Sequence, residues 1–95
     1  MRVTLRLLSI LAVRAGLKPG EALDFDLSAG ATLADLLAAM DRRIGDRLPL
    51  QTWNRATCQF SSHVLFLIDG VQTADPSTPL REGSTVMVMV PIAGG

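Results

Sequence analysis

Apolar and polar residues alternate near the start of the chain, and this alternation predicts two strands. Residues 3–9 place Val3, Leu5 and Leu7 on one side of an extended chain. Residues 22–27 repeat the pattern with Leu23 and Phe25. A period of two residues is the signal of a strand with one buried face. Residues 10–20 are expected to form a loop, so the two strands make an N-terminal hairpin.

A different spacing follows and predicts a helix. Thr32 is a suitable N-cap, and Asp35 three residues later can complete a capping box. The apolar residues after it recur at helical intervals and form one face: Leu33, Leu36, Leu37, Met40 and Ile44. Gly45 is expected to end the helix as a C′ glycine. Arg42 and Arg43 are expected to form its solvated end.

Two more strands are expected after residue 62, at 64–68 and 84–90, with a turn at Asp69-Gly70. Residues 46–62 show no period and are expected to hold a short helical turn. The predicted class is α+β, with one main helix packed across a mixed sheet of four to five strands. With the first and last strands parallel at the centre, this is the β-grasp, or ubiquitin-like, fold. A ferredoxin-like fold would need a second helix within 46–62.

Size and charge indicate one small globular domain over residues 1–95, with a flexible tail at 91–95. Nine basic and nine acidic residues balance, so no overall charge favours nucleic acid or an anionic membrane. The single cysteine excludes an internal disulfide, and no cofactor or metal site is expected. The apolar run at 7–13 is short for a signal peptide, and none is long enough to span a membrane. We therefore expect a cytoplasmic protein.

The last residues of the chain, Gly94 and Gly95, suggest chemistry at a terminal carboxylate. Glycine has no Cβ, so a diglycine is thin enough to enter a narrow channel. Pro91 is expected to end strand pairing and direct the tail outward. The alternative reading is an ordinary frayed terminus.

Several motifs together resemble those of the MoaD/ThiS family of sulfur carriers, the prokaryotic relatives of ubiquitin. The resemblance covers nearly the whole chain. Its motifs are the helix start Thr32–Leu37, Ile68-Asp69-Gly70, the turn 80–86, and the terminus 90–95. Three departures are Ser84 where the family commonly has Asp, a single Pro91 where the molybdopterin branch has a Pro-Pro pair, and the loop 46–62, whose Trp53 and Cys58 the family pattern does not demand.

The resemblance implies that an ATP-dependent, ubiquitin-activating-type enzyme adenylates the Gly95 carboxylate. A sulfur nucleophile then displaces AMP and leaves a thiocarboxylate, which a sulfur-accepting synthase uses. The large subunit of molybdopterin synthase is the first candidate for that synthase. The chain carries no catalytic base or phosphate loop of its own, so it is expected to be a cosubstrate or small subunit. No bound cofactor is implied, because the activating partner uses the ATP.

Strand alternation also predicts a docking surface on the face of the sheet away from the helix. Four apolar residues are expected there beside the tail: Leu8, Leu67, Met87 and Met89. Together with Pro91 and Ile92 they are the predicted partner-binding residues. Methionine-rich apolar patches are typical of surfaces that meet several partners. The competing interpretation is that the loop 46–62 covers them, with Trp53 as the covering group.

Three functions stay open at this point. The thiocarboxylate could feed molybdopterin, thiamine, cysteine, tRNA thiolation or a secondary metabolite. Gly95 could instead form an isopeptide bond to a lysine of another protein, or the chain could be a β-grasp interaction module. Cys58 is interpreted as a semi-buried thiol, His63 as an edge residue, and Trp53 as the anchor of its loop.

Overall fold

A computed structural model describes residues 1–61 and 64–90 of the chain. The strands are β1 (Arg2–Leu7), β2 (Ala22–Asp26), β3 (Trp53–Asn54), β4 (Gln59–Phe60), β5 (Leu65–Ile68), β6 (Val71–Thr73) and β7 (Thr85–Met89). The helices are α1 (Ser9–Arg14), α2 (Leu33–Ile44) and the 3₁₀ turn η1 (Gly45–Arg47).

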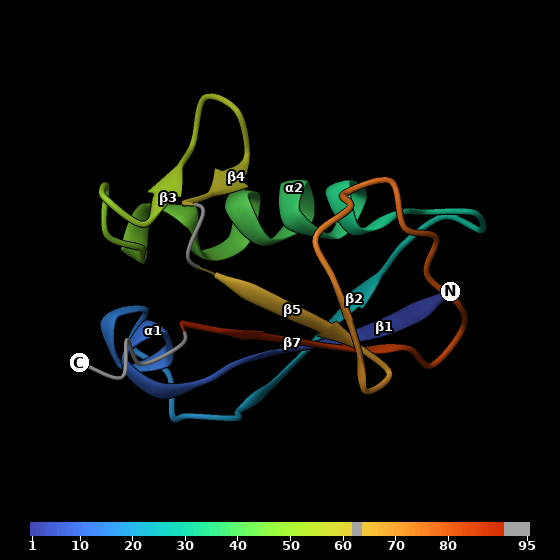
Figure 1. Ribbon diagram of the computed structural model, residues 1–95, viewed down its shortest axis with the longest axis horizontal. Coiled ribbons are helices and arrows are strands. Elements are labelled where there is room, and N and C mark those ends of the chain that lie inside the picture. Colours follow the sequence, from blue (N-terminus) through green and yellow to red (C-terminus); the bar gives the residue numbers. More distant parts are fainter. Residues whose placement is uncertain (62–63, 91–95) are drawn as a thin grey trace.

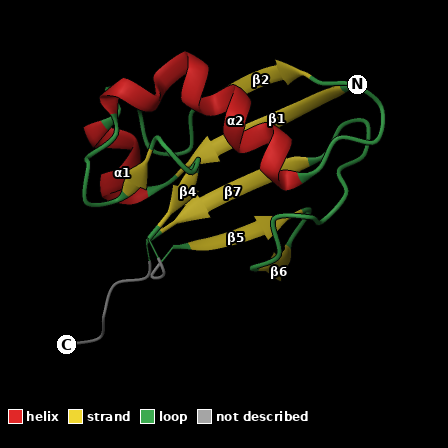
Figure 2. Cartoon of the chain, turned by 90° about the horizontal axis from the view of Figure 1, so that it is seen from above, coloured by secondary structure: helices red, strands yellow, loops and turns green. Residues whose placement is uncertain are grey.

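Five strands form one mixed sheet in the order β2-β1-β7-β5-β6. The central pair, β1 and β7, is parallel, and the other pairs are antiparallel. Helix α2 lies across one face of the sheet (Figures 1 and 2). The predicted β-grasp architecture is confirmed, including the parallel pairing of the first and last long strands.

The predicted register of the two central strands is also confirmed. Val3, Leu5 and Leu7 of β1 are at most 1% exposed, and Val86 and Val88 of β7 are 0% exposed. These side chains meet the apolar stripe of α2, whose buried members include Leu36, Leu37 and Met40. Because side chains alternate along a strand, their neighbours must point to the opposite face.

Helix α1 corrects the expectation of a loop at 10–20. Leu8 follows β1 in an extended conformation as the N-cap residue, and the chain then turns helical at Ser9. Leu11, Ala12 and Ala15 bury one side of this short helix against the core. The expected strand end at Ser9 is therefore also wrong by two residues. Fewer than two helical turns are too short to show a period in the sequence, so burial of this side decided the structure.

Gly45 does not end α2 as a left-handed C′ residue. Its φ is −59°, and the chain continues into the η1 turn. A Cβ at this position would clash with Oδ1 of Asp41. That oxygen accepts hydrogen bonds from Trp53 Nε1 at 2.7 Å and from Arg55 Nε at 2.9 Å. Glycine is therefore needed here for close approach to Asp41.

Residues 46–62 contain more structure than the sequence indicated. The predicted helical turn is present as η1, but β3 and β4 also pair as a small hairpin. Leu48 and Trp53 are buried, at 5% and 1% exposed, so Trp53 does anchor the segment. The second helix that a ferredoxin-like fold would need does not occur within the described part of this segment.

The predicted turn and capping box are both present. Asp69 and Gly70 have φ of 50° and 85°, the left-handed values of a two-residue hairpin turn between β5 and β6. The Thr32 N–H donates to Asp35 Oδ2 at 2.8 Å. Arg43 is not simply solvated, because its Nη1 donates to the Asp24 carbonyl at 2.7 Å. It thereby covers the outer edge of β2.

Candidate functional site

The central strand β7 leads directly to the predicted reactive tail. It ends at Met89, and Val90 packs partly buried against the core. Pro91, Ile92, Gly94 and Gly95 lie outside the described residues. A tail of residues 91–95 can reach at most roughly 17 Å beyond the sheet. A partner that binds Gly95 must therefore come close to the end of β7.

The predicted apolar residues lie together on the face of the sheet away from α2. Leu67 is directly opposite Met87, and Leu65 is directly opposite Met89. The Leu8 N–H donates to the Val88 carbonyl at 3.0 Å, which places Leu8 beside the end of β7. We define the sheet patch as Leu8, Leu65, Leu67, Met87 and Met89, all of which are partly exposed.

The character of this outer face changes along the strands. Towards the start of β1 and β7 it becomes polar, with Thr4, Thr85, Asp24 and Asp26. Thr4 Oγ1 donates to Asp24 Oδ1 at 2.8 Å, and Arg2 lies 3.9 Å from Asp26. The apolar residues are therefore concentrated at the end from which the tail leaves.

The segment 46–62 does not cover this patch in its described part. The Trp53 and Phe60 rings pack at a tilt with 4.6 Å between their centroids, and the Phe60 ring centroid lies 5.8 Å from that of Phe66. Phe66 alternates with Leu65 and Leu67, so these rings lie on the helix side. Figure 1 shows the β3–β4 hairpin on the same side of the sheet as α2. The interpretation that Trp53 covers the patch is wrong, because its ring is buried on the other layer.

Comparison with known proteins adds the decisive observation. Residues 14–95 match the ThiS family. The chain belongs to the ThiS family. Members of this family are sulfur carriers or ubiquitin-like modifiers. No curated protein sequence matches the chain.

Solved structures with the same fold include two small archaeal modifier proteins. SAMP1 from Haloferax volcanii is 21% identical, with full coverage of both chains and a TM-score of 0.81. SAMP1 from Methanosarcina acetivorans is 18% identical, covering 99% of this chain and 96% of that one, with a TM-score of 0.70. A putative molybdopterin converting factor subunit 1 from Pyrococcus furiosus is 16% identical, covering 97% and 99%, with a TM-score of 0.68.

Ser84, one departure of this ThiS-family chain from the expected motif, is hydrogen bonded to a carboxylate elsewhere in the fold. Ser84 is only 3% exposed, and its Oγ donates to Asp69 Oδ2 at 3.0 Å. The same Oγ accepts the Arg81 N–H, while Asp69 Oδ1 accepts the Thr85 N–H. The carboxylate that links the β5–β6 turn to the start of β7 is thus on Asp69.

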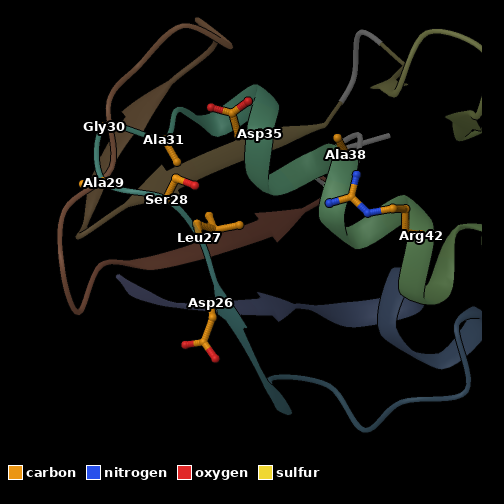
Figure 3. Close-up of a pocket in the computed structure, with 9 residues that line it drawn as sticks. All are labelled: Asp26, Leu27, Ser28, Ala29, Gly30, Ala31, Asp35, Ala38 and Arg42. Carbon is orange, nitrogen blue, oxygen red and sulfur yellow. The ribbon is translucent and has the colours of Figure 1, made fainter.

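One cavity among the described residues, of about 390 Å³, lies between α2 and the loop after β2 (Figure 3), and its lining offers no clear competing chemistry. Asp35 and Arg42 project from α2, but Asp35 is already engaged by Thr32 in the capping box. Asp26, on the opposite wall, pairs with Arg2 at the start of β1. This cavity therefore lies at the end of the sheet away from the tail.

Cys58 and His63 are the two remaining residues that the sequence singled out. Cys58 is partly buried in the β3–β4 turn at a φ of 53°, with Sγ 3.8 Å from the Arg55 carbonyl. His63 lies outside the described residues. Within the described ranges there is no cluster of three or more metal-ligating side chains. In those same ranges no helix is long and apolar enough to cross a membrane.

Sequence reasoning missed two residues near the candidate site. Ile10 and Val13 were expected in a loop, but they project from α1 and are 52% and 57% exposed. The apolar composition of residues 7–13 was visible in the sequence. Which of those residues are buried depends on how α1 packs, and the sequence pattern does not show that.

Proposed function

We propose that this chain is a sulfur carrier that works through the Gly95 carboxylate. A carboxylate oxygen attacks the α-phosphorus of ATP, and pyrophosphate leaves. A hydrosulfide ion, or its equivalent from a sulfur donor, adds to the acyl carbon of the mixed anhydride, and AMP leaves. The product is a thiocarboxylate. The activating partner uses ATP, and the carrier itself binds no cofactor.

The observation that carries this proposal is the position of the sheet patch. Five partly exposed apolar residues surround the end of the strand that leads into the diglycine. An apolar patch beside the strand that precedes the proposed reactive carboxylate suits a protein that must dock while another protein's active site holds its tail. Family membership points to the same chemistry.

We further propose that the partners are an adenylating enzyme of the ubiquitin-activating type and a sulfur-accepting synthase. Proteins of this family work with activating enzymes and synthase subunits. The Pyrococcus furiosus neighbour is a putative molybdopterin converting factor subunit. This favours molybdopterin synthesis as the pathway and the large subunit of molybdopterin synthase as the acceptor.

Intact-mass spectrometry tests the proposal. The full chain is incubated with ATP, sulfide and the activating enzyme from the same organism. A mass gain equal to one sulfur-for-oxygen exchange is expected, and it should be absent without ATP. Adenylation of another carrier protein by the same enzyme shows that the enzyme is active. If the mass of this chain stays unchanged with that active enzyme, the proposal is rejected.

A second candidate function is conjugation of Gly95 to lysines, suggested by neighbours that are themselves named modifier proteins. Lys18 is the only lysine in the sequence, so replacing it distinguishes conjugation to another protein's lysine from conjugation between copies of this chain. In a Lys18→Arg background, any lysine that carries the C-terminal peptide of this chain, residues 82–95 after cleavage by trypsin, must belong to another protein. Such conjugates, recovered from cells, would support the modifier function.

A further inference from the structure

The exposed face of helix α1 carries two large apolar side chains that the core does not use. Ile10 is 52% exposed and Val13 is 57% exposed. They are three residues apart and therefore lie on one face of the helix. The opposite face buries Leu11, Ala12 and Ala15. Core packing thus explains one side of α1 and leaves the other side unexplained.

The position of α1 relates this face to the tail. Leu8, its N-cap residue, hydrogen bonds to Val88 and belongs to the sheet patch. In both ribbon views α1 lies beyond the end of the sheet at which the β7 arrow ends (Figures 1 and 2). Helix α1 and the sheet patch therefore lie at the same end of the molecule. Ile10 and Val13 also precede residues 14–95, the stretch that matches the family.

We propose that the Ile10–Val13 face of α1 is a second docking surface, and that its occupant is the adenylating enzyme. This inference rests on the proposed function. The enzyme must hold Gly95 in its active site, and residues 91–95 reach at most roughly 17 Å. Its surface must therefore approach the end of β7, where α1 lies. The partner surface should be apolar opposite Ile10 and Val13.

The positive charge of Arg14 predicts a further feature of the partner's surface. Arg14 ends α1 on its exposed side, and among the described residues it takes part in no ion pair. A carboxylate on the enzyme near Arg14 would complement it at the rim of the contact. The adenylating enzyme is the fitting occupant because sulfur transfer and lysine conjugation both require activation of the carboxylate first.

The test is steady-state adenylation kinetics with the full chain as the varied substrate. The variants are Ile10→Glu and Val13→Glu, with Val71→Glu as the matched control. Val71 is 69% exposed and pairs with Ile68, near the start of β7, away from the tail. Circular dichroism and thermal unfolding establish that each variant is folded.

For the two α1 variants we expect KM to rise by about tenfold or more, with kcat changed less than about twofold at saturation. Val71→Glu should match the wild type. An unchanged KM in folded α1 variants overturns the inference while the proposed function stands. Failure of the wild-type chain to be adenylated rejects the proposed function instead. Sedimentation that shows a wild-type dimer and monomeric α1 variants would assign the face to self-association and overturn the inference.

Discussion

At the residue scale, one carboxylate organises the segment between α2 and β5. Asp41 is 16% exposed and accepts hydrogen bonds from Arg55 and Trp53. The Arg55 bond, followed by the Trp53 bond, holds the pKa of Asp41 below its ordinary value of 3.8. Gly45 leaves the space that this carboxylate occupies. These residues together fix the hairpin on the helix layer, away from the sheet patch.

Gly45→Ala should destabilise the fold, because its Cβ would displace the Asp41 carboxylate from Trp53 and Arg55. We expect the melting temperature to fall by roughly 4 to 8 °C. The control is the same change in an Asp41→Ala background, where no carboxylate remains to be displaced. There the additional loss should be small, a non-additivity that a double-mutant cycle measures. Additive losses would show that Gly45 matters for another reason.

Asp41 also predicts a pH dependence of stability. Its pKa is lower in the folded than in the unfolded chain, so its stabilising effect is present above 3.8 and lost as pH falls through the folded pKa. Asp75, whose pKa is lowered by hydrogen bonds from Ser77, adds to the same trend.

Thermal unfolding from about pH 5 to about pH 2.5 measures this effect. Asp41→Asn should lower the melting temperature at neutral pH and flatten its decline in acid. The matched control is Asp26→Asn, which removes an exposed ion pair with Arg2 that should contribute little. An Asp41→Asn profile parallel to the wild type would contradict the assignment.

At the element scale, the register of β7 separates the core from the docking surface. Val86 and Val88 face α2, while Met87 and Met89 face outward in line with Leu67 and Leu65. A slip of one residue would exchange the two faces. The strand thus carries the stability of the fold on one side and the proposed docking surface on the other.

Val88→Asp and Met89→Asp should therefore have opposite effects. An unpaired charge at Val88, which is 0% exposed, should unfold the chain. Met89→Asp should leave it folded but weaken binding to the activating enzyme and to the acceptor, with Leu67→Asp behaving alike. Circular dichroism and isothermal titration calorimetry distinguish these outcomes. A folded Val88→Asp with an unfolded Met89→Asp would overturn the register.

At the scale of the whole molecule, folding and chemistry occupy separate parts of the chain. The described core depends on α2 and the five-stranded sheet, and the proposed chemistry depends on residues that follow Val90. The sheet patch and α1 lie at the end of the sheet from which those residues continue. Changes to the diglycine should therefore affect reaction without affecting stability.

Deleting Gly95, or changing Gly94→Phe, should abolish adenylation while the melting temperature stays within about 1 °C of the wild type. A shorter or bulkier end cannot place the carboxylate at the reacting position of a narrow channel. Pyrophosphate exchange and thermal unfolding are the two measurements. Adenylation of the truncated chain would reject the terminal-carboxylate mechanism, and a large fall in melting temperature would show that the tail is structural.

The sequence by itself determined the β-grasp class, the α2 boundaries, the Asp69-Gly70 turn and the inward face of β1 and β7. The last three rest on a local pattern, such as a period, a cap or a turn pair, and the class follows from the order of the elements that these patterns predict. Helix α1, the β3–β4 hairpin and the role of Gly45 were decided only by the tertiary structure. Helix α1 is too short to show a period. The hairpin depends on the hydrogen bond from Trp53 to Asp41. Glycine is required at position 45 because the Asp41 carboxylate occupies the space of a Cβ, and only the folded chain brings the two together.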